Sequence, residues 1–294
     1  MIDIVEVGPR DGLQNEKKLL STNQKVQLIE KLIKSGIKTI EAVSFVNPKI
    51  VPQMADAEEV LKQVPRIDGV SYAGLVLSRS GLERALLTNV DALHVVTATS
   101  DEFNFKNVKR TVAQSVEELV KVISEGVSSN KTVVGVLGTS FGCPFAGEVP
   151  VANLLKVAEA FVSTGATGIT LADTTGLANP SQVIDVVKTF KKEFKNDIEL
   201  GLHFHNTRGL GLANVLAGYQ AGIRRFDSSI AGLGGCPFAP KAVGNVCTED
   251  MINMFERMGI ETTANLEGLI QTALWMEQQM ERSLDGMLMK AGIA

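Results

Sequence analysis

Two histidines in the segment LHFHN have the spacing of a metal-binding pair. His203 and His205 are two positions apart, so on an extended strand both imidazoles project from one face while Phe204 projects from the other. Two neutral imidazoles combined with carboxylate and amide oxygens make an octahedral site for a divalent cation, Mg²⁺ or Mn²⁺, with positions left for substrate or water. Zn²⁺ accepts the same ligand types. Taken alone, the pair could equally be polar residues that end a strand.

Further polar residues that could serve such a site lie far away in the sequence. Arg10 and Asp11 belong to the polar segment EVGPRDGLQNE (6–16), which directly follows the first apolar run. A loop that only joined two elements would need neither an arginine beside an aspartate nor two glycines. The other candidates are Glu41, Asp173, Cys236 and Asn245. Whether these side chains meet depends on the fold.

Short β-branched or apolar runs alternate along the chain with longer segments of helical periodicity. We expect strands at residues 2–7, 38–43, 70–76, 91–97, 132–140, 167–173, 198–205 and 224–232. We expect helices at residues 23–35, 51–64, 79–87, 115–128, 151–164, 181–194 and 209–221. Ser21 or Thr22 caps the first helix, and the pair Asn179-Pro180 opens the sixth. Glycines end several helices, as in KSGIKTIE (34–41).

Eight strand–helix units in about 230 residues match the size of a TIM barrel, a closed (β/α)₈ cylinder of parallel strands. An open doubly wound sheet is the structural alternative. Because no linker or low-complexity tract divides the chain, we expect one α/β domain over residues 1–294. Helical segments at 248–258 and 263–285 give it additional C-terminal helices at about 247–285. One of them completes the eighth unit, and the other packs across the barrel or against a second subunit.

The expected barrel allows the candidate residues to be tested. Functional residues of this fold lie at the carboxyl ends of the strands, so each candidate should be found at such an end. Every candidate falls at such an end: Arg10 and Asp11 after the first strand, Glu41 in the second, Asp173 in the sixth, both histidines in the seventh, and Cys236 and Asn245 after the eighth. Asp11 and Asn245 are expected at the same end of the barrel as the two histidines. This favours a metal site over the alternative that the histidines are only polar residues ending a strand. Asp173 could instead cap the turn that follows it.

Composition and charge disfavour several classes of partner. The chain has 294 residues, a formal charge of −4 and a pI near 5.6, with no basic stripe, so we expect no nucleic-acid partner. Its first residues, MIDIVEVGPR, lack the basic start of a signal peptide and the long apolar core of a membrane span. We therefore expect a cytoplasmic protein without a membrane partner. The glycine run AGLGG matches neither nucleotide fingerprint, which disfavours nucleotide hydrolysis and dinucleotide redox chemistry.

The three cysteines are too few for a disulfide framework and lack the CxxC spacing. Cys143 and Cys247 are interpreted as buried apolar residues. Cys236 has a different setting, because Gly234 and Gly235 before it let the backbone approach a ligand closely. A thiol there can act as a general acid.

Five separated motifs resemble the 3-hydroxy-3-methylglutaryl-CoA (HMG-CoA) lyase family. They are EVGPRDGLQNE (6–16), EAVSFVNPKIVPQM (41–54), LADTTG (171–176), HFHNTRG (203–209), and AGLGGCPFAP (231–240) with GNVCTED (244–250). The similarity extends from residue 2 to about residue 285 and keeps the order of the family. Claisen-type synthases of the same superfamily share the histidine pair and the Arg-Asp dipeptide, so these two features indicate only the superfamily. The full residue sequence of the first motif and the cysteine loop indicate the lyase.

The resemblance implies a metal-dependent carbon–carbon lyase that acts on an acyl-CoA thioester, as a homodimer. It implies that Asp11, His203, His205 and Asn245 bind a divalent metal cation, that Arg10, Glu41 and Cys236 serve the reaction, and that Gln14 and Asp173 support the site. Arg10 suits the developing enolate oxygen, and Glu41 suits the orientation of Arg10. His203 and Asp11 both remain candidates for the general base.

Two alternatives stay open for the reaction. One is a Claisen-type synthase that joins an acyl-CoA to a 2-oxo acid, which would leave the thiol of Cys236 idle. The other is a lyase for a longer-chain 3-hydroxyglutaryl-CoA. Lys241 departs from the small residues that the family commonly has after CPFAP. It is either a solvated surface substitution or, by our hypothesis, a determinant of acyl-chain or CoA preference.

Overall fold

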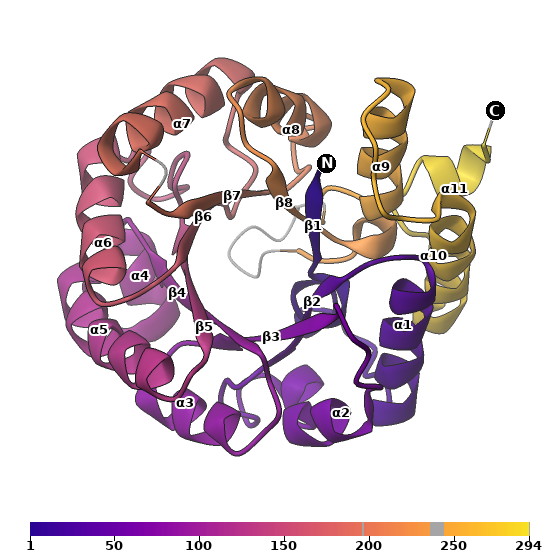
Figure 1. Ribbon diagram of the computed structural model, residues 1–294, viewed down its shortest axis with the longest axis horizontal. Helices are drawn as coiled ribbons and strands as arrows, with labels where there is room; N and C mark the ends of the chain where they lie inside the picture. Colours follow the sequence, from indigo (N-terminus) through magenta and orange to yellow (C-terminus); the bar gives the residue numbers. More distant parts are fainter. Residues whose placement is uncertain (196, 236–243, 294) are drawn as a thin grey trace.

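Parallel strands close into a barrel in the computed structural model, which describes residues 1–195, 197–235 and 244–293 (Figure 1). The strands run β1 to β8 in sequence order, and β8 pairs in parallel with β1. This pairing leaves no sheet edge, so the predicted TIM barrel is confirmed and the open sheet is excluded. The strands are β1 Asp3–Glu6, β2 Thr39–Ser44, β3 Ser71–Val76, β4 Ala92–Ala98, β5 Thr132–Gly138, β6 Gly168–Asp173, β7 Glu199–Phe204 and β8 Arg225–Ser228.

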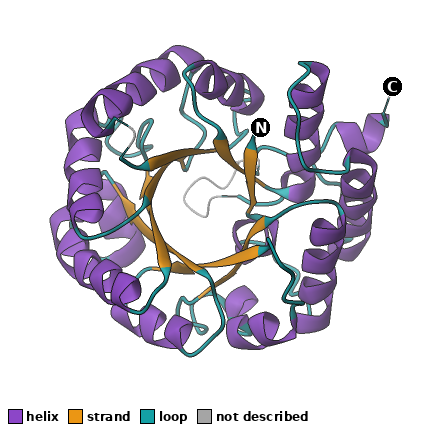
Figure 2. Cartoon of the chain, in the orientation of Figure 1, coloured by secondary structure: helices purple, strands orange, loops and turns teal. Residues whose placement is uncertain are grey.

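Helices surround the strands as an outer ring (Figure 2). They are α1 Thr22–Lys34, α2 Ala57–Gln63, α3 Arg79–Leu86, α4 Asp101–Val108, α5 Val112–Ser128, α6 Val151–Ser163, α7 Pro180–Phe194, α8 Gly211–Gln220, α9 Thr248–Arg257, α10 Leu266–Met280 and α11 Leu288–Ala291. Three shorter elements are the π-helix η1 Gly8–Gly12 and the 3₁₀ helices η2 Pro52–Met54 and η3 Ile230–Gly232. The segment expected as one helix at 51–64 is divided into η2 and α2, and α4 was not predicted.

Local chemistry fixes the ends of these elements. Ser21 is the N-cap of α1, where its hydroxyl accepts from the backbone N–H of Gln24 and the Gln24 side chain accepts from the N–H of Ser21. Asn179 caps α7 and Pro180 opens it. Gly36, after α1, has a φ of 88°, a conformation that favours glycine and that turns the chain into β2.

The C-terminal helices pack within the chain. After β8, α9 completes the eighth unit, and α10 contacts both α9 and α1 (Figure 1). The apolar face of α10 is buried, and Asn265 at its start donates its N–H to the carbonyl of Ser35 at 2.7 Å. Burial against α1 within one protomer therefore accounts for the apolar face that the sequence left undecided between barrel and second subunit.

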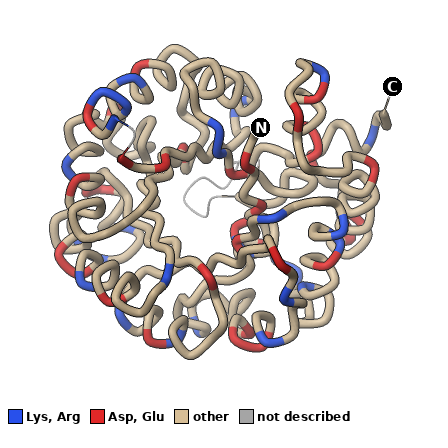
Figure 3. Tube along the Cα trace, viewed as in Figure 1, with Lys and Arg blue, Asp and Glu red and all other residues tan. Residues whose placement is uncertain are grey.

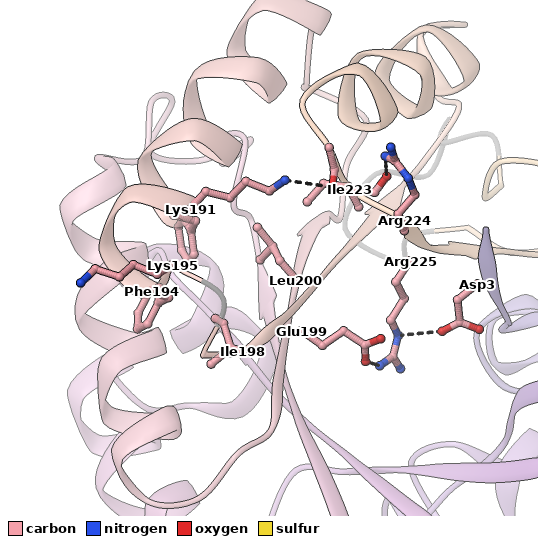
Figure 4. Close-up of a pocket in the computed structure, with 12 residues that line it drawn as sticks. Asp3, Lys191, Phe194, Lys195, Ile198, Glu199, Leu200, Ile223, Arg224 and Arg225 are labelled. Atoms are coloured by element: carbon pink, nitrogen blue, oxygen red, sulfur yellow. Dashed lines mark hydrogen bonds and ion pairs between the residues drawn. The ribbon is translucent and has the colours of Figure 1, made fainter. Parts of the chain in front are cut away.

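The N-terminal end of the barrel is held together by ion pairs. Arg225 at the start of β8 lies 2.5 Å from Glu199 (Nη1–Oε2) and 4.0 Å from Asp3 (Nε–Oδ2). A cavity of about 230 Å³ beside them is also lined by Lys191 and Lys195 (Figure 4). Because TIM-barrel active sites lie at the opposite end, we assign this cavity to the base of the fold and not to its chemistry.

Charges of both signs are interspersed over the outer helices (Figure 3). Such mixing provides no one-sided field across the ring of helices. Within the described ranges, none of the helices combines the length and the apolar character that a bilayer crossing requires.

Candidate active site

The segment that carries Arg10 and Asp11 forms one π-helical turn directly after β1. Such turns are rare and are frequent at functional sites. A Cβ at Gly8 would lie 2.6 Å from Glu6 Oε1, and one at Gly12 would lie 2.9 Å from the Cβ of Leu233. The two glycines of the motif are therefore needed so that this turn can pack against the segment after β8.

Asp11, His203 and His205 come together into one buried cluster at the C-terminal rim. Oδ2 of Asp11 lies 3.9 Å from Nε2 of His203 and 3.9 Å from Nε2 of His205. The three ligand atoms lie within 4.8 Å of one another. A carboxylate oxygen and two imidazole nitrogens at these separations match the donor set of a divalent metal site.

Asn245 completes the cluster with an amide oxygen that has no hydrogen-bond partner among the described residues. Its Nδ2 donates to Asp11 Oδ2 at 2.8 Å and to the carbonyl of Leu233 at 3.1 Å. Its Oδ1 is buried and accepts no hydrogen bond from any described residue. A buried acceptor without a donor is costly, and a bound cation would satisfy it. The residues present therefore fit a divalent metal.

Asp227 orients one of the two imidazoles. Nδ1 of His203 lies 3.2 Å from Asp227 Oδ2, which leaves Nε2 directed at Asp11. A carboxylate behind a histidine ligand fixes both its tautomer and its orientation. The sequence analysis missed Asp227, which lies in β8 between Phe226 and Ser228 and has no sequence motif around it.

Arg10 joins the metal cluster to a second carboxylate. Its Nη1 lies 2.6 Å from Asp11 Oδ1, and its Nε lies 2.5 Å from Glu41 Oε2. Burial alone would raise the pKa of Asp11, but Arg10, His203 and His205 outweigh burial and lower it to about 2. Gln14 adds a hydrogen bond from Nε2 to Asp11 Oδ1 at 3.2 Å. Asp11 is thus ionised and ready to bind a cation.

The other oxygen of Glu41 meets a third histidine. Nδ1 of His94 lies 2.7 Å from Glu41 Oε1. Burial acts to raise the pKa of Glu41, but Arg10 and then His94 outweigh it and lower the pKa. Sequence reasoning missed His94, because a single polar residue in the apolar run DALHVVT resembles an interruption of the strand.

Asp173 lies at the same rim, but its carboxylate is occupied by the loop that follows β6. Its Oδ1 accepts from the N–H of Leu177 at 2.8 Å and its Oδ2 from that of Ala178 at 3.0 Å. Burial raises its pKa to about 6 despite these bonds. The geometry matches a cap of the turn, the alternative that the sequence left open.

Cys236 and Lys241 lie outside the described residues. Of the other cysteines, Cys143 and Cys247 are free and buried. Burial raises the pKa of the Cys247 thiol, which disfavours its reactive thiolate form.

Comparison with known proteins tests the resemblance directly. The HMGL-like family model matches residues 1–275. The chain belongs to the HMGL-like family. Hydroxymethylglutaryl-CoA lyase YngG of Bacillus subtilis is 41% identical over 283 residues, which cover 96% of this chain and 94% of the relative. An (R)-citramalyl-CoA lyase of Chloroflexus aurantiacus is 39% identical over 301 residues, with coverages of 99% and 95%.

Solved structures of the family share the fold over the whole barrel. The HMG-CoA lyase of Bacillus subtilis has a TM-score of 0.95 at 40% identity and covers 99% of this chain and 97% of its own. An HMG-CoA lyase of Acinetobacter baumannii in complex with coenzyme A and 3-methylmalate has a TM-score of 0.95 at 42% identity, with coverages of 99% and 95%. The resemblance inferred from the five motifs is confirmed.

Two more buried carboxylates of this HMGL-like chain lie behind the site. Glu6 accepts from the N–H groups of Gly8 and Ile230, at 2.7 and 2.9 Å, and ties η1 to η3. Glu249 in α9 accepts from the N–H of Ala231 at 3.0 Å. Burial raises the pKa of Glu6 to about 7 and that of Glu249 to about 8.

These raised pKa values predict that the folded protein loses stability as the pH rises. The folded state holds protons that the unfolded chain releases near pH 4.5, so the free energy of unfolding falls between about pH 4.5 and pH 8. The glutamine side chain of the Glu249→Gln variant cannot ionise. This variant is expected to be more stable than the wild type at pH 8.5 by on the order of a few kcal/mol, and equally stable at about pH 4, below the pKa of the unfolded carboxyl. Urea unfolding at both pH values measures this, with exposed Glu261→Gln as the control. An unchanged pH dependence in Glu249→Gln would refute the assignment.

Proposed function

We propose that this protein is a divalent-metal-dependent lyase that cleaves HMG-CoA to acetyl-CoA and acetoacetate. The observation that carries the proposal is the contact between Arg10 and Asp11, which joins a permanent cation to a buried cluster suited to a metal at one rim. The full-length similarity to named HMG-CoA lyases supports the same reaction.

The metal would be Mg²⁺ or Mn²⁺, and Asp11, His203, His205 and Oδ1 of Asn245 would hold it. Once bound, it supplies a Lewis acid that lowers the pKa of the substrate hydroxyl. The chain supplies the rest of the site: Asp227 and Arg10 hold His203 and Asp11 in position, and all four side chains are buried.

Arg10 stabilises the charge that develops during cleavage. When the C2–C3 bond breaks, its electron pair moves to the thioester as an enolate, while the 3-hydroxyl loses its proton and becomes the ketone of acetoacetate. Three of the five guanidinium N–H groups contact Glu41 and Asp11, so two remain for the enolate oxygen. His203 and Asp11 are the candidate acceptors of the hydroxyl proton.

Cys236 is the proposed general acid that protonates C2 of the enolate and so completes acetyl-CoA. Cys236→Ala is expected to lower kcat by about 10²–10⁴, the usual contribution of a positioned acid, with little change in metal binding. Steady-state kinetics with HMG-CoA measure the effect, and Cys143→Ala serves as the matched cysteine control. A Cys236→Ala enzyme with wild-type kcat would remove the thiol from the reaction.

The similarity to a citramalyl-CoA lyase favours a second candidate substrate. Both compounds are acyl-CoA thioesters with a hydroxyl on C3, so one rim can cleave either. Incubation of the protein and Mg²⁺ with HMG-CoA, (R)-citramalyl-CoA or a longer-chain 3-hydroxyglutaryl-CoA gives kcat/KM for each. We expect HMG-CoA to be preferred and acetoacetate to form. No acetoacetate, with acetyl-CoA consumed in the presence of a 2-oxo acid, would favour the synthase.

Assembly and location complete the proposal. We propose a single-domain protein that works in the cytoplasm, and the family resemblance leads us to expect a homodimer. Light scattering after gel filtration should give about twice the 31.5 kDa mass of the chain. A monomeric mass would contradict the dimer and leave the lyase assignment intact.

A further inference from the structure

His94 is the one histidine of the chain that lies outside the metal cluster. It sits in the middle of β4, where Leu93 before it faces Gly126 of α5. Successive side chains of a strand point to opposite faces, so His94 points into the barrel. There it contacts Glu41 of β2, across the intervening β3, while only 3% of its surface is exposed. A buried polar side chain in the interior of a TIM barrel calls for a physical reason, because apolar residues usually fill that space.

Glu41 connects His94 to the guanidinium. One carboxylate oxygen, Oε1, meets Nδ1 of His94 at 2.7 Å, and the other, Oε2, meets Nε and Nη2 of Arg10 at 2.5 Å each. Since the pKa of Glu41 is lowered, its carboxylate is ionised and only accepts hydrogen bonds. Nδ1 of His94 therefore carries the hydrogen of this bond.

We infer that His94 is a positioning residue for Arg10, acting through Glu41. Among the described residues, His94 is the only donor to Oε1 of Glu41. A carboxylate bonded at one oxygen alone can rotate, whereas one bonded at both oxygens is fixed in its plane. Because the guanidinium of Arg10 pairs with that carboxylate, the plane of Glu41 sets the direction of the two N–H groups left for the enolate. This inference rests on the proposed lyase function.

The other ring nitrogen offers a competing role. Nε2 of His94 is buried and has no hydrogen-bond partner among the described residues. If the function of His94 were a direct contact with substrate, Nε2 would make it. Two amide substitutions separate the roles, because the amide of asparagine reaches the position of Nδ1 and the amide of glutamine reaches the position of Nε2.

The experiment compares His94→Val, His94→Asn and His94→Gln in steady-state kinetics. A lost hydrogen bond to a charged group corresponds to about a tenfold change, so His94→Val and His94→Gln are expected to lower kcat about tenfold with KM nearly unchanged. His94→Asn restores the donor to Glu41 and should recover most of the kcat. In a Glu41→Ala background, His94→Val should cause no further loss, because the group that transmits its effect is gone.

Controls separate positioning from a general disturbance of the barrel. Thr170→Val removes another buried polar group, on β6, that has no bond to Arg10 or Glu41, and it should keep wild-type kcat. In ¹⁵N spectra of imidazole nitrogens, the resonance of His94 Nδ1 should have the shift of a protonated nitrogen and should change in Glu41→Ala. That spectrum requires no turnover and reports the contact even if His94→Val folds poorly.

Three results would overturn the inference. They are a wild-type kcat in His94→Val, recovery by glutamine but not by asparagine, and a full additional loss in the Glu41→Ala background. If the wild-type protein itself fails to cleave any of the acyl-CoA substrates, the proposed function is wrong. If the wild type is active and His94→Val is equally active, only the positioning role is wrong.

Discussion

Arg10→Lys is expected to lower kcat by about 10²–10³, the usual effect of losing one preorganised oxyanion donor. Lysine keeps the positive charge but has no planar fork. It cannot pair with Glu41 and Asp11 at once and still present two N–H groups to the enolate. Because the four proposed metal ligands remain, Mn²⁺ should still bind. Rate measurements at saturating HMG-CoA and metal test the prediction.

A surface arginine provides the matched control for this substitution. Arg66 pairs with both oxygens of Asp91 near the start of β4, and its side chain is 44% exposed. Arg66→Lys breaks the same kind of fork-to-carboxylate pair far from the rim and should leave kcat unchanged. If Arg10→Lys were as active as Arg66→Lys, a simple charge would suffice and the role given to the fork of Arg10 would be wrong.

His205→Ala is expected to weaken Mn²⁺ binding by more than about 100-fold, since loss of an outer-shell partner alone commonly costs 10–100-fold. The substitution removes one of three clustered ligand atoms and leaves Asp227 and Arg10 in place. Lyase activity at micromolar metal should fall along with the Mn²⁺ affinity. Excess metal should recover part of the lost activity. Calorimetric or spin-resonance titration with Mn²⁺ measures the affinity.

His94→Val is the histidine control for the metal titration. His94 is as buried as His205, but its hydrogen bond is to Glu41, which lies outside the proposed ligand set. The His94→Val variant should therefore bind Mn²⁺ as the wild type does. Equal losses in His94→Val and His205→Ala would show that any buried histidine supports metal binding indirectly, against the assigned ligand set.

The barrel was predictable because its sequence signals are local and repeated. Ser21, Asn179 and Gly36 end elements through their own backbone chemistry, and alternating strands and helices fix the class. Helix α4 escaped prediction because its two phenylalanines lie on opposite faces: Phe103 is buried, whereas Phe105 is exposed. Such a segment has no apolar stripe at helical spacing.

The site was predictable only where its residues lie at strand ends. Asp11 and the histidine pair follow from that rule. His94 occurs singly within an apolar run, Asp227 belongs to no recognisable motif, and their partners are brought to them only when the barrel is closed. Asp173 obeys the rule, yet both its oxygens accept backbone hydrogen bonds from the loop after β6. Position at the rim therefore predicts proximity to the site but not the task of a side chain.

The packing of the last helices could not be predicted from the sequence for another reason. The apolar face of α10 would suit a barrel or a second subunit equally, since both bury the same kind of surface. The partner, α1, lies more than two hundred residues earlier, and only the closed ring brings them together.

Diffraction from crystals grown with Mn²⁺, recorded near the manganese absorption edge, tests the central claim most directly. We predict one strong anomalous peak at the C-terminal rim, within bonding distance of Asp11, His203, His205 and Oδ1 of Asn245. A peak at another place, or a coordinated ion that does not contact Asp11, would contradict the account.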